Sequence, residues 1–478
     1  MEKITLRQYG KWLPADVQTT ISLFMGLVGD QPGILLESAE VDGRWGRHSL
    51  MAWDFRLVLE PDAGKLKVIC KDERLAAVKE LEGEPYMEGV RKAIQILNVI
   101  PNLDGLPGIT RGLIGYFGYG VGGMLEPKLA TVLPPETAEA RLVLPGRVML
   151  FDHLHHRCCF LSLDADAPLS PAQTEWFAPL TVPATVPDAE PTALPNREEY
   201  KNSVLQAKEL ISEGECIQVV LSTRFSVPAT DSPFRIYRRL RQVNPSPHMF
   251  YMKFEDGVLL GSSPEMMVRC QKGRLEVRPI AGTRPRGQNG TEDLAMEREL
   301  LADPKERAEH VMLVDLGRND LGRIATAGSV TVQKFMQVER FSHVMHLTSY
   351  VEADLRPGLD AIDVLAATFP AGTVSGAPKI RAMEIIADLE LVNEATQDRG
   401  PYAGCIGWVG LDEGSVDLDT GITIRSMWIR DGVCYWQAGA GIVFDSDPEK
   451  EWQECNNKAR VIREVVRGKE DSDVFADR

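Results

Sequence analysis

Apolar and polar side chains alternate along much of the first 163 residues, and this period of two predicts short strands. A helix is expected at residues 85–99, and residues 112–120 predict a glycine-rich strand with aromatic side chains on one face. Residues 146–151 and 158–163 have the pattern of a hairpin. Further strands are expected at residues 33–38, 48–53, 56–60 and 67–70.

Helical spacing enters the pattern after residue 195. Asn196 and Glu199 have the spacing of a capping box, and the helix that they open should end at Gly214. The strand expected at residues 216–225 has apolar side chains at its odd positions, which places Gln218 on the opposite face, toward a polar pocket or toward solvent. Ser375 is expected to cap a helix with Pro378 in its first turn, leaving open amides for a carboxylate. The other elements expected here are helices at 305–316 and around 451–454, a salt-bridged turn at 315–323, and strands at 275–280, 401–407, 421–426 and 439–443.

A proline-rich segment divides the chain. Residues 164–195 contain seven prolines and little apolar periodicity, so they are interpreted as a linker or surface loop. The predicted parts are an N-terminal subdomain, residues 1–163, and a C-terminal domain, residues 196–467. Residues 468–478 form a charged tail.

The composition excludes several function classes. The net charge of −16 makes the chain a poor binder of nucleic acid or of an anionic membrane. No apolar run approaches the ~20 residues that span a bilayer, and the N-terminus has no apolar signal core. The eight cysteines include no CxxC pair and fit a reducing cytosol, so a cytoplasmic protein is expected. Three histidines and an aspartate in residues 152–157 are better interpreted as a polar hairpin turn than as a metal site.

Residues 278–287 concentrate positive charge on a short strand that runs into a tight turn. Arg278, Arg284 and Arg286 suit a small, multiply anionic substrate, although a solvated basic turn has the same pattern. Gly282 lets the backbone bend and approach a ligand closely, and Thr283 offers a hydroxyl and an amide.

Residues 279–287 resemble the signature loop of the chorismate-utilising enzymes, and within that family the large subunits of anthranilate synthases. Six further motifs agree, and the resemblance covers about residues 30–465. It implies an α+β fold in which two large antiparallel β-sheets pack as a sandwich with helices outside. It also implies a lyase that converts chorismate and ammonia to anthranilate and pyruvate, the first committed step of tryptophan biosynthesis.

The resemblance assigns a role to each matching residue. Glu265 is the general acid that protonates the leaving 4-hydroxyl, which requires a raised pKa. His346 handles a proton during pyruvate elimination, and Thr373 lies in the pocket. Arg425 pairs with the enolpyruvyl carboxylate. The other implied substrate contacts are Gly282, Thr283, Tyr402, Gly439, Ala440, Gly441 and Lys458.

Two ExxE pairs on predicted helices, 306–309 and 451–454, are compatible with Mg²⁺, which prefers oxygen ligands, but such pairs are common on helix surfaces. The resemblance assigns Mg²⁺ to Glu309 and Glu454. The metal would hold the ring carboxylate of chorismate.

Two positions distinguish the activities within the family. Relatives that hydroxylate chorismate carry a lysine base at the position of Gln218, and an amide cannot take a proton from water. Aminodeoxychorismate synthases carry a nucleophilic lysine at the position of Ala281, and alanine cannot attack. Both residues favour direct attack by ammonia.

The resemblance also implies regulation and a partner. Glu37 and Ser38, together with Pro247, His248 and Met249, match the feedback site for tryptophan, although a tyrosine is usual at position 248. Ammonia would come from a separate glutamine amidotransferase subunit, because no histidine here is followed two residues later by glutamate. The alternatives are an aminodeoxychorismate synthase component and a non-catalytic tryptophan-binding subunit. The set Glu265, Glu309, His346, Arg425 and Glu454 argues against the latter.

Overall fold

The computed structural model describes residues 3–38, 46–165, 190–340, 344–392, 395–396 and 398–467. Most of the predicted linker and all of the predicted tail lie outside these residues, as do positions 341–343.

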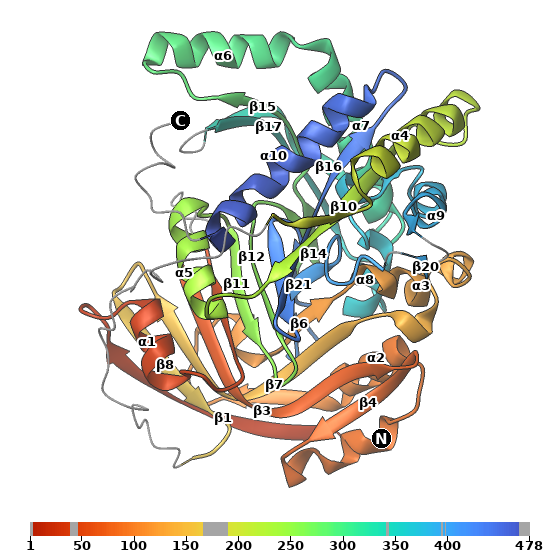
Figure 1. The fold of residues 1–478 in the computed structure, drawn as a ribbon. Coiled ribbons are helices and arrows are strands. Elements are labelled where there is room, and N and C mark those ends of the chain that lie inside the picture. Colours follow the sequence, from red (N-terminus) through yellow and green to blue (C-terminus); the bar gives the residue numbers. More distant parts are fainter. Residues whose placement is uncertain are drawn as a thin grey trace.

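Antiparallel strands dominate the described residues. Twenty-two strands are joined into one hydrogen-bonded network, and the pairing of β1 (Ile4–Pro14) with β5 (Leu97–Pro101) is the parallel one among those described. The N-terminal strands form a layer at the bottom of Figure 1, and helices α4, α7 and α10 lie toward the opposite end. The α+β class with a large antiparallel sheet and outer helices is confirmed. The remaining strands of the network are β2 (Gly33–Glu37), β3 (His48–Asp62), β4 (Lys65–Cys70), β6 (Gly112–Phe117), β7 (Ala140–Asp152), β8 (Arg157–Ser162), β9 (Thr192–Leu194), β10 (Gln218–Pro228), β11 (His248–Lys253), β12 (Val258–Ser263), β13 (Met266–Gln271), β14 (Arg274–Val277), β15 (Ile280–Pro285), β16 (Thr331–Arg340), β17 (Val344–Asp354), β18 (Gly376–Ala377), β21 (Cys405–Gly410), β22 (Leu418–Ile422), β23 (Ser426–Arg430) and β24 (Val433–Ile442).

Helices cover the strand network. The capping box predicted at Asn196 is confirmed, since its side chain accepts from the amide of Glu199, whose carboxylate accepts from the Asn196 amide. The helices are α1 (Thr20–Leu27), α2 (Tyr86–Ile96), α3 (Gly122–Leu125), α4 (Arg197–Ser212), α5 (Pro233–Val243), α6 (Gly290–Ala302), α7 (Pro304–Gly322), α8 (Ala361–Thr368), α9 (Lys379–Leu389) and α10 (Pro448–Arg467).

The parts on either side of the proline-rich segment share their sheet and their core. Strand β2 pairs with β11, and β6 pairs with β21. Ile34 and Ile114 are buried in the same apolar cluster as Phe250 and Ile406. The sequence boundary at residues 164–195 therefore does not coincide with a break in the strand network.

Several predicted elements are corrected by tertiary contacts. The strands expected at 48–53 and 56–60 are one strand, β3, because pairing with β7 resumes after the left-handed Asp54 and a register shift between Phe55 and Leu57. The helix expected to end near residue 316 continues to Gly322 and absorbs the predicted turn. Within it, Asp320 forms the buried ion pair of that region, with Lys379 at 2.8 Å.

The helix start predicted at Ser375 is wrong. Helix α9 begins at Lys379 after Pro378, and the Ser375 hydroxyl donates instead to the carbonyl of Ala371 at 2.9 Å. Gly376 and Ala377 pair with β10 as β18. These residues belong to the sheet, so the open amides expected for a carboxylate are not at Ser375.

Candidate active site

Glu265 lies between β12 and β13, deep in the molecule, and burial raises the pKa of its carboxyl to about 7. Thr373, Lys458 and Arg425 each act in the opposite direction, so these three side chains surround the carboxyl. The Thr373 hydroxyl is close enough to lower this pKa, and its Oγ1 is buried without a hydrogen-bond partner among the described residues. The raised pKa that the sequence required of a general acid is therefore present.

Arg425 separates β22 from β23. Its φ of 48° breaks the single strand predicted at residues 421–426, and its carbonyl accepts from the amide of Ser262 at 3.1 Å. The side chain retains solvent access, while its dense surroundings lower the pKa of the guanidinium and Glu265 raises it. A left-handed residue at this position turns the side chain out of the strand pattern and toward Glu265.

His346 on β17 is held by contacts with Gly282 and Thr283 of β15. Its Nδ1 lies 3.0 Å from the carbonyl oxygen of Gly282 and 3.1 Å from the hydroxyl of Thr283. Because a carbonyl only accepts, Nδ1 carries the proton of the neutral ring and Nε2 keeps a lone pair. Burial lowers the pKa of His346, which favours this neutral form. The tight turn predicted at Gly282 is wrong, because Gly282 lies within β15, where a φ of 67° accompanies a bulge in the pairing with β17 between Ala281 and Thr283.

The ladder between β10 and β24 contains three of the predicted substrate contacts. Gly439, Ala440 and Gly441 lie opposite Ser222, Leu221 and Val220. A Cβ at Gly441 would lie 2.8 Å from Nε2 of Gln218, and a Cβ at Gly439 would lie 2.9 Å from the hydroxyl of Tyr402. These glycines are therefore required for the close approach of Gln218 and Tyr402.

Glu309 of α7 lies within electrostatic range of Glu306 on the same helix and of Glu454 on α10. Burial raises the pKa of Glu309, and the neighbouring charges of Glu306 and Glu454 raise it further. Lys458 lies 2.7 Å from Glu454 and 3.1 Å from the carbonyl of Gly439, which places this group beside the β24 glycines. No three His, Cys, Asp or Glu side chains in the described part of the chain are arranged to hold a metal ion by themselves.

The three arginines of residues 278–287 are already paired with carboxylates of the chain. Arg278 pairs with Glu339, Arg284 with Asp303 at 2.8 Å, and Arg286 with Asp293. These pairs compensate the charge of the cluster within the chain, and its interpretation as a receptor for an anionic substrate stays a prediction. To bind an anionic ligand, each of these arginines would have to share or break its ion pair with a carboxylate of the chain.

The two predicted tryptophan motifs lie side by side, because Met249 of β11 is opposite Glu37 of β2. The Glu37 carboxylate points toward α5, where it accepts from Tyr237 at 2.7 Å and from Arg241 at 3.0 Å. His248 lies against β22 instead, with a Cβ at Gly421 only 2.8 Å from its ring. Ser38 Oγ and His248 Nδ1 are buried without a hydrogen-bond partner among the described residues. Sequence reasoning did not identify Tyr237 and Arg241 as contacts of Glu37. Both lie on α5, which precedes the second motif in the chain.

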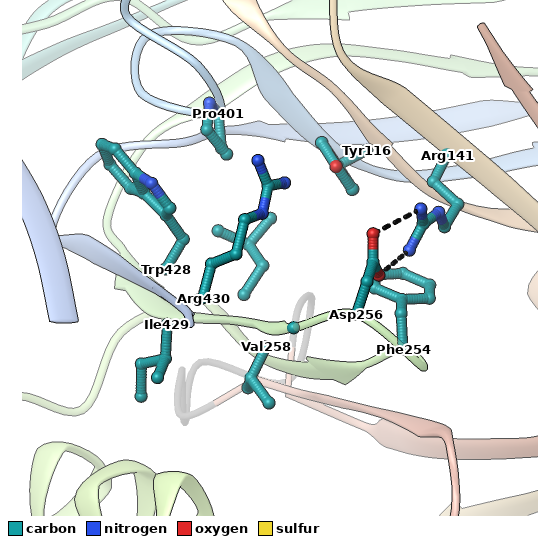
Figure 2. A pocket seen from close by; sticks show the side chains of 11 residues that line it. Tyr116, Arg141, Phe254, Asp256, Val258, Pro401, Trp428, Ile429 and Arg430 are labelled. Carbon is teal, nitrogen blue, oxygen red and sulfur yellow. Dashed lines mark hydrogen bonds and ion pairs between the residues drawn. The ribbon is translucent and has the colours of Figure 1, made fainter. Parts of the chain in front are cut away.

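Figure 2 shows a separate small pocket that contains none of the predicted site residues. It has about 20 Å³ of space, enough for roughly one water molecule. Asp256 at its edge accepts from Arg141 at 3.0 Å. Its size excludes a substrate such as chorismate, so Glu265 and its neighbours remain the candidate site.

Comparison with known proteins gives a family for this arrangement. The model of the chorismate binding enzyme family matches residues 56–464. The chain belongs to this family. Anthranilate synthase component 1 of Acetivibrio thermocellus is 40% identical, over 95% of this chain and 93% of that protein. The corresponding protein of Aquifex aeolicus is 42% identical, over 96% and 94%.

Solved structures agree with the fold of this chorismate binding enzyme. Anthranilate synthase component I from Streptococcus pneumoniae is 33% identical, with a TM-score of 0.70 over 94% of this chain and 98% of that one. The menaquinone-specific isochorismate synthase of Escherichia coli has the same TM-score of 0.70 at 20% identity, which shows a shared fold only. The resemblance of the sequence to anthranilate synthase large subunits is thereby confirmed.

None of the described helices is long and apolar enough to cross a membrane.

Proposed function

We propose that this chain is the synthase component of an anthranilate synthase, a lyase that converts chorismate and ammonia to anthranilate, pyruvate and water. The observation that carries the proposal is the Glu265 carboxyl, whose pKa is raised by burial to about 7 beside Thr373, Arg425 and Lys458. A carboxyl with this pKa is partly protonated near neutrality and can serve as a general acid. The family membership makes chorismate the expected substrate.

In the proposed reaction, ammonia attacks C2 of chorismate and the ring double bonds shift. The C4–O bond breaks as Glu265 gives its proton to the departing hydroxyl, which leaves as water. A base then removes the proton from C2, the enolpyruvyl group leaves as pyruvate, and the ring becomes aromatic.

His346 suits the role of that base. Its Nδ1 donates to the carbonyl of Gly282, so the lone pair is on Nε2, and burial keeps the ring neutral by lowering its pKa. Gln218 has no comparable basicity, which disfavours activation of water. Ala281 is buried on β15 and offers no amine, which disfavours the covalent route of aminodeoxychorismate synthases.

Recognition of the substrate is assigned to the charges around Glu265. Arg425 would pair with the enolpyruvyl carboxylate through its planar fork. Lys458 would add a second positive charge beside the Gly439 carbonyl. Tyr402 and Thr283 would contact the ring and its substituents.

Mg²⁺ fits the carboxylates of α7 and α10. Burial raises the pKa of Glu309, and the charges of Glu306 and Glu454 raise it further; a cation between Glu309 and Glu454 would offset this repulsion. Two carboxylates without a third protein ligand suit Mg²⁺, which keeps waters and takes ligands from its substrate. When bound, the ion would stabilise negative charge on the ring carboxylate of chorismate.

A glutamine amidotransferase subunit is the proposed source of ammonia, since the sequence lacks a His-x-Glu segment of its own. We also propose that tryptophan binds at the end of the β2–β11 ladder, beyond the Glu37–Met249 pair, and inhibits the enzyme. The proposal is supported by Ser38 Oγ and His248 Nδ1, which are buried there without a partner among the described residues. The eight unpaired cysteines fit a cytoplasmic location.

The test uses the purified chain with chorismate, Mg²⁺ and ammonium at alkaline pH, with products identified chromatographically. Anthranilate with pyruvate is expected. Formation of 4-amino-4-deoxychorismate or isochorismate would contradict the proposal, and tryptophan binding without any product would favour the regulatory subunit.

A further inference from the structure

The strongest unassigned feature of the molecule is a buried ion pair behind the candidate site. Arg399 and Glu390 have side-chain exposures of 1% and 3%. Arg399 Nε donates to Glu390 at 2.9 Å and Nη2 donates to its second oxygen at 2.6 Å. The Glu390 carboxylate and nearby tyrosines outweigh the effect of burial and raise the pKa of Arg399, so the guanidinium stays charged.

The guanidinium also fixes two backbone segments that carry candidate site residues. Nη1 donates to the carbonyl of Val374 at 2.8 Å, and Val374 follows Thr373 in the chain. Nη2 donates to the carbonyl of Val220 at 2.7 Å, and Val220 lies opposite Gly441 in the ladder. One planar group therefore sets the distance between the Thr373 turn and the β10–β24 ladder.

Glu390 connects the ion pair to Gly439, the other glycine of β24 that faces β10. It accepts from both the amide and the hydroxyl of Ser222, at 2.8 and 2.7 Å. Ser222 is the ladder partner of Gly439, against which the hydroxyl of Tyr402 packs. The Tyr402 ring itself lies 5.7 Å from the Arg399 guanidinium.

An ion pair that served only stability would not need to contact the backbone segments that carry candidate site residues. Buried ion pairs contribute little net stability compared with apolar residues of the same volume, since both charges lose their hydration. Here two of the four side-chain hydrogen bonds of Arg399 go to Glu390, and the other two go to the carbonyls of Val374, next to Thr373, and of Val220, two residues after Gln218. The Arg399 carbonyl also accepts from the amide of Tyr402 at 3.1 Å.

We infer that the Arg399–Glu390 pair is a positioning element of the active site, which holds Thr373 against Glu265 and Tyr402 against the β24 glycines. Arg399 reaches neither substrate nor reacting atoms; it acts through the residues that it orients. The inference rests on the proposed function, because Glu265 is taken as the general acid.

Arg399→Lys tests it, because lysine keeps the charge but cannot donate to Glu390, Val374 and Val220 together. We expect kcat to fall by about tenfold or more, in line with the large effect of small displacements on catalysis. The Thr373 hydroxyl lowers the pKa of Glu265, so a displaced Thr373 should move the alkaline limb of the kcat profile to higher pH. The matched control is Arg111→Lys, at another partly buried pair, with Asp412, which should alter the melting temperature and leave the profile unchanged.

The double variant Glu390→Gln/Arg399→Met removes both charges and serves where the single variant does not fold. It should show the same loss of kcat and the same displacement of the profile. Wild-type kcat and an unmoved profile in either folded variant would overturn the inference, as would a loss of activity explained by the unfolded fraction alone.

The infrared titration of the Glu265 carboxyl, assigned by its absence in Glu265→Gln, gives the same readout without turnover. If wild type makes no anthranilate, the proposed function fails, whereas identical titration of this carboxyl in wild type and Arg399→Lys would overturn the inference whether or not anthranilate forms.

Discussion

The Glu265 carboxyl is the single side chain on which the proposed chemistry depends most. Glu265→Gln keeps its size and removes the acidic proton, so we expect kcat for anthranilate formation to fall by about 10²–10⁴-fold, with a smaller change in KM for chorismate. Glu276→Gln is the matched control, since burial also raises the pKa of Glu276, which lies on β14. A kcat near wild type in the Glu265 variant would exclude Glu265 as the acid.

The same carboxyl couples folding to pH. Its pKa is 4.5 in the unfolded chain and about 7 when folded. The stability that it contributes is therefore full below pH 4.5 and is lost as the pH rises to 7, a difference of roughly 3 kcal/mol. Glu265→Gln should consequently be more stable than wild type at pH 8, and this gain should shrink toward pH 5. Denaturant unfolding at both pH values measures it, and an equal gain at both would contradict the burial argument.

The contacts of the Glu37 carboxylate lead to a prediction about inhibition by tryptophan. Its carboxylate is held by Tyr237 and Arg241 and would meet the ammonium of bound tryptophan. Glu37→Gln removes a charge-assisted contact, so the tryptophan concentration for half inhibition should rise about tenfold or more, while uninhibited kcat stays the same. Glu60→Gln is the control, because Glu60 is also nearly buried and pairs with Lys67 and Arg141. Unchanged inhibition in Glu37→Gln would remove this residue from the site.

At the scale of elements, α7 and α10 face each other through their carboxylates. Glu309→Gln and Glu454→Gln should each raise the Mg²⁺ concentration for half activation by at least about tenfold, a loss that even outer-shell changes cause. Glu464→Gln provides the control on α10, where Glu464 pairs with Arg460 at the surface. Magnesium titration of the ammonium-dependent rate measures the effect. Activity that survives a chelator in wild type would reject the metal.

Local signals and long-range contacts explain which elements the sequence predicted. Helix α4 was predictable because Asn196 and Glu199 form its cap within one turn. The helix cap predicted at Ser375 was wrong because Gly376 and Ala377 pair with β10 in the sheet. Strand β10 lies more than 140 positions earlier in the chain. The pairing of the arginines of residues 278–287 was not predicted, because Asp293 lies on α6, Asp303 between α6 and α7, and Glu339 on β16. Arg399 was missed because nothing in its neighbourhood signals that its charge is buried.

The candidate site itself was largely predictable by residue, since short motifs carried Glu265, His346 and Arg425. Its geometry was not. The left-handed Arg425 and the glycines that admit Gln218 and Tyr402 depend on strand pairings between distant segments. A motif identifies a residue, whereas the register of the sheet decides what that residue meets.

At the scale of the whole molecule, the strand network joins the N-terminal part to the site. Strand β2 supplies Glu37 to a pairing with β11, and β6 pairs with β21, which leads from Tyr402. Since apolar residues of both parts share one buried cluster, removal of the first part would expose that core to water. The proposed catalytic residues all lie after residue 196, whereas part of the strand network that supports them lies before it.

This arrangement predicts how a divided chain should behave. Residues 1–165 and 190–478, coexpressed as separate chains, should copurify as a one-to-one complex that forms anthranilate, because β2–β11 and β6–β21 pairing needs no covalent connection. Residues 190–478 expressed alone should aggregate, since β11 and β21 would present unpaired edges and apolar faces. Size-exclusion chromatography and the ammonium-dependent assay distinguish the outcomes. A soluble, active fragment 190–478 would mean that the catalytic part folds by itself and that the N-terminal strands serve regulation alone.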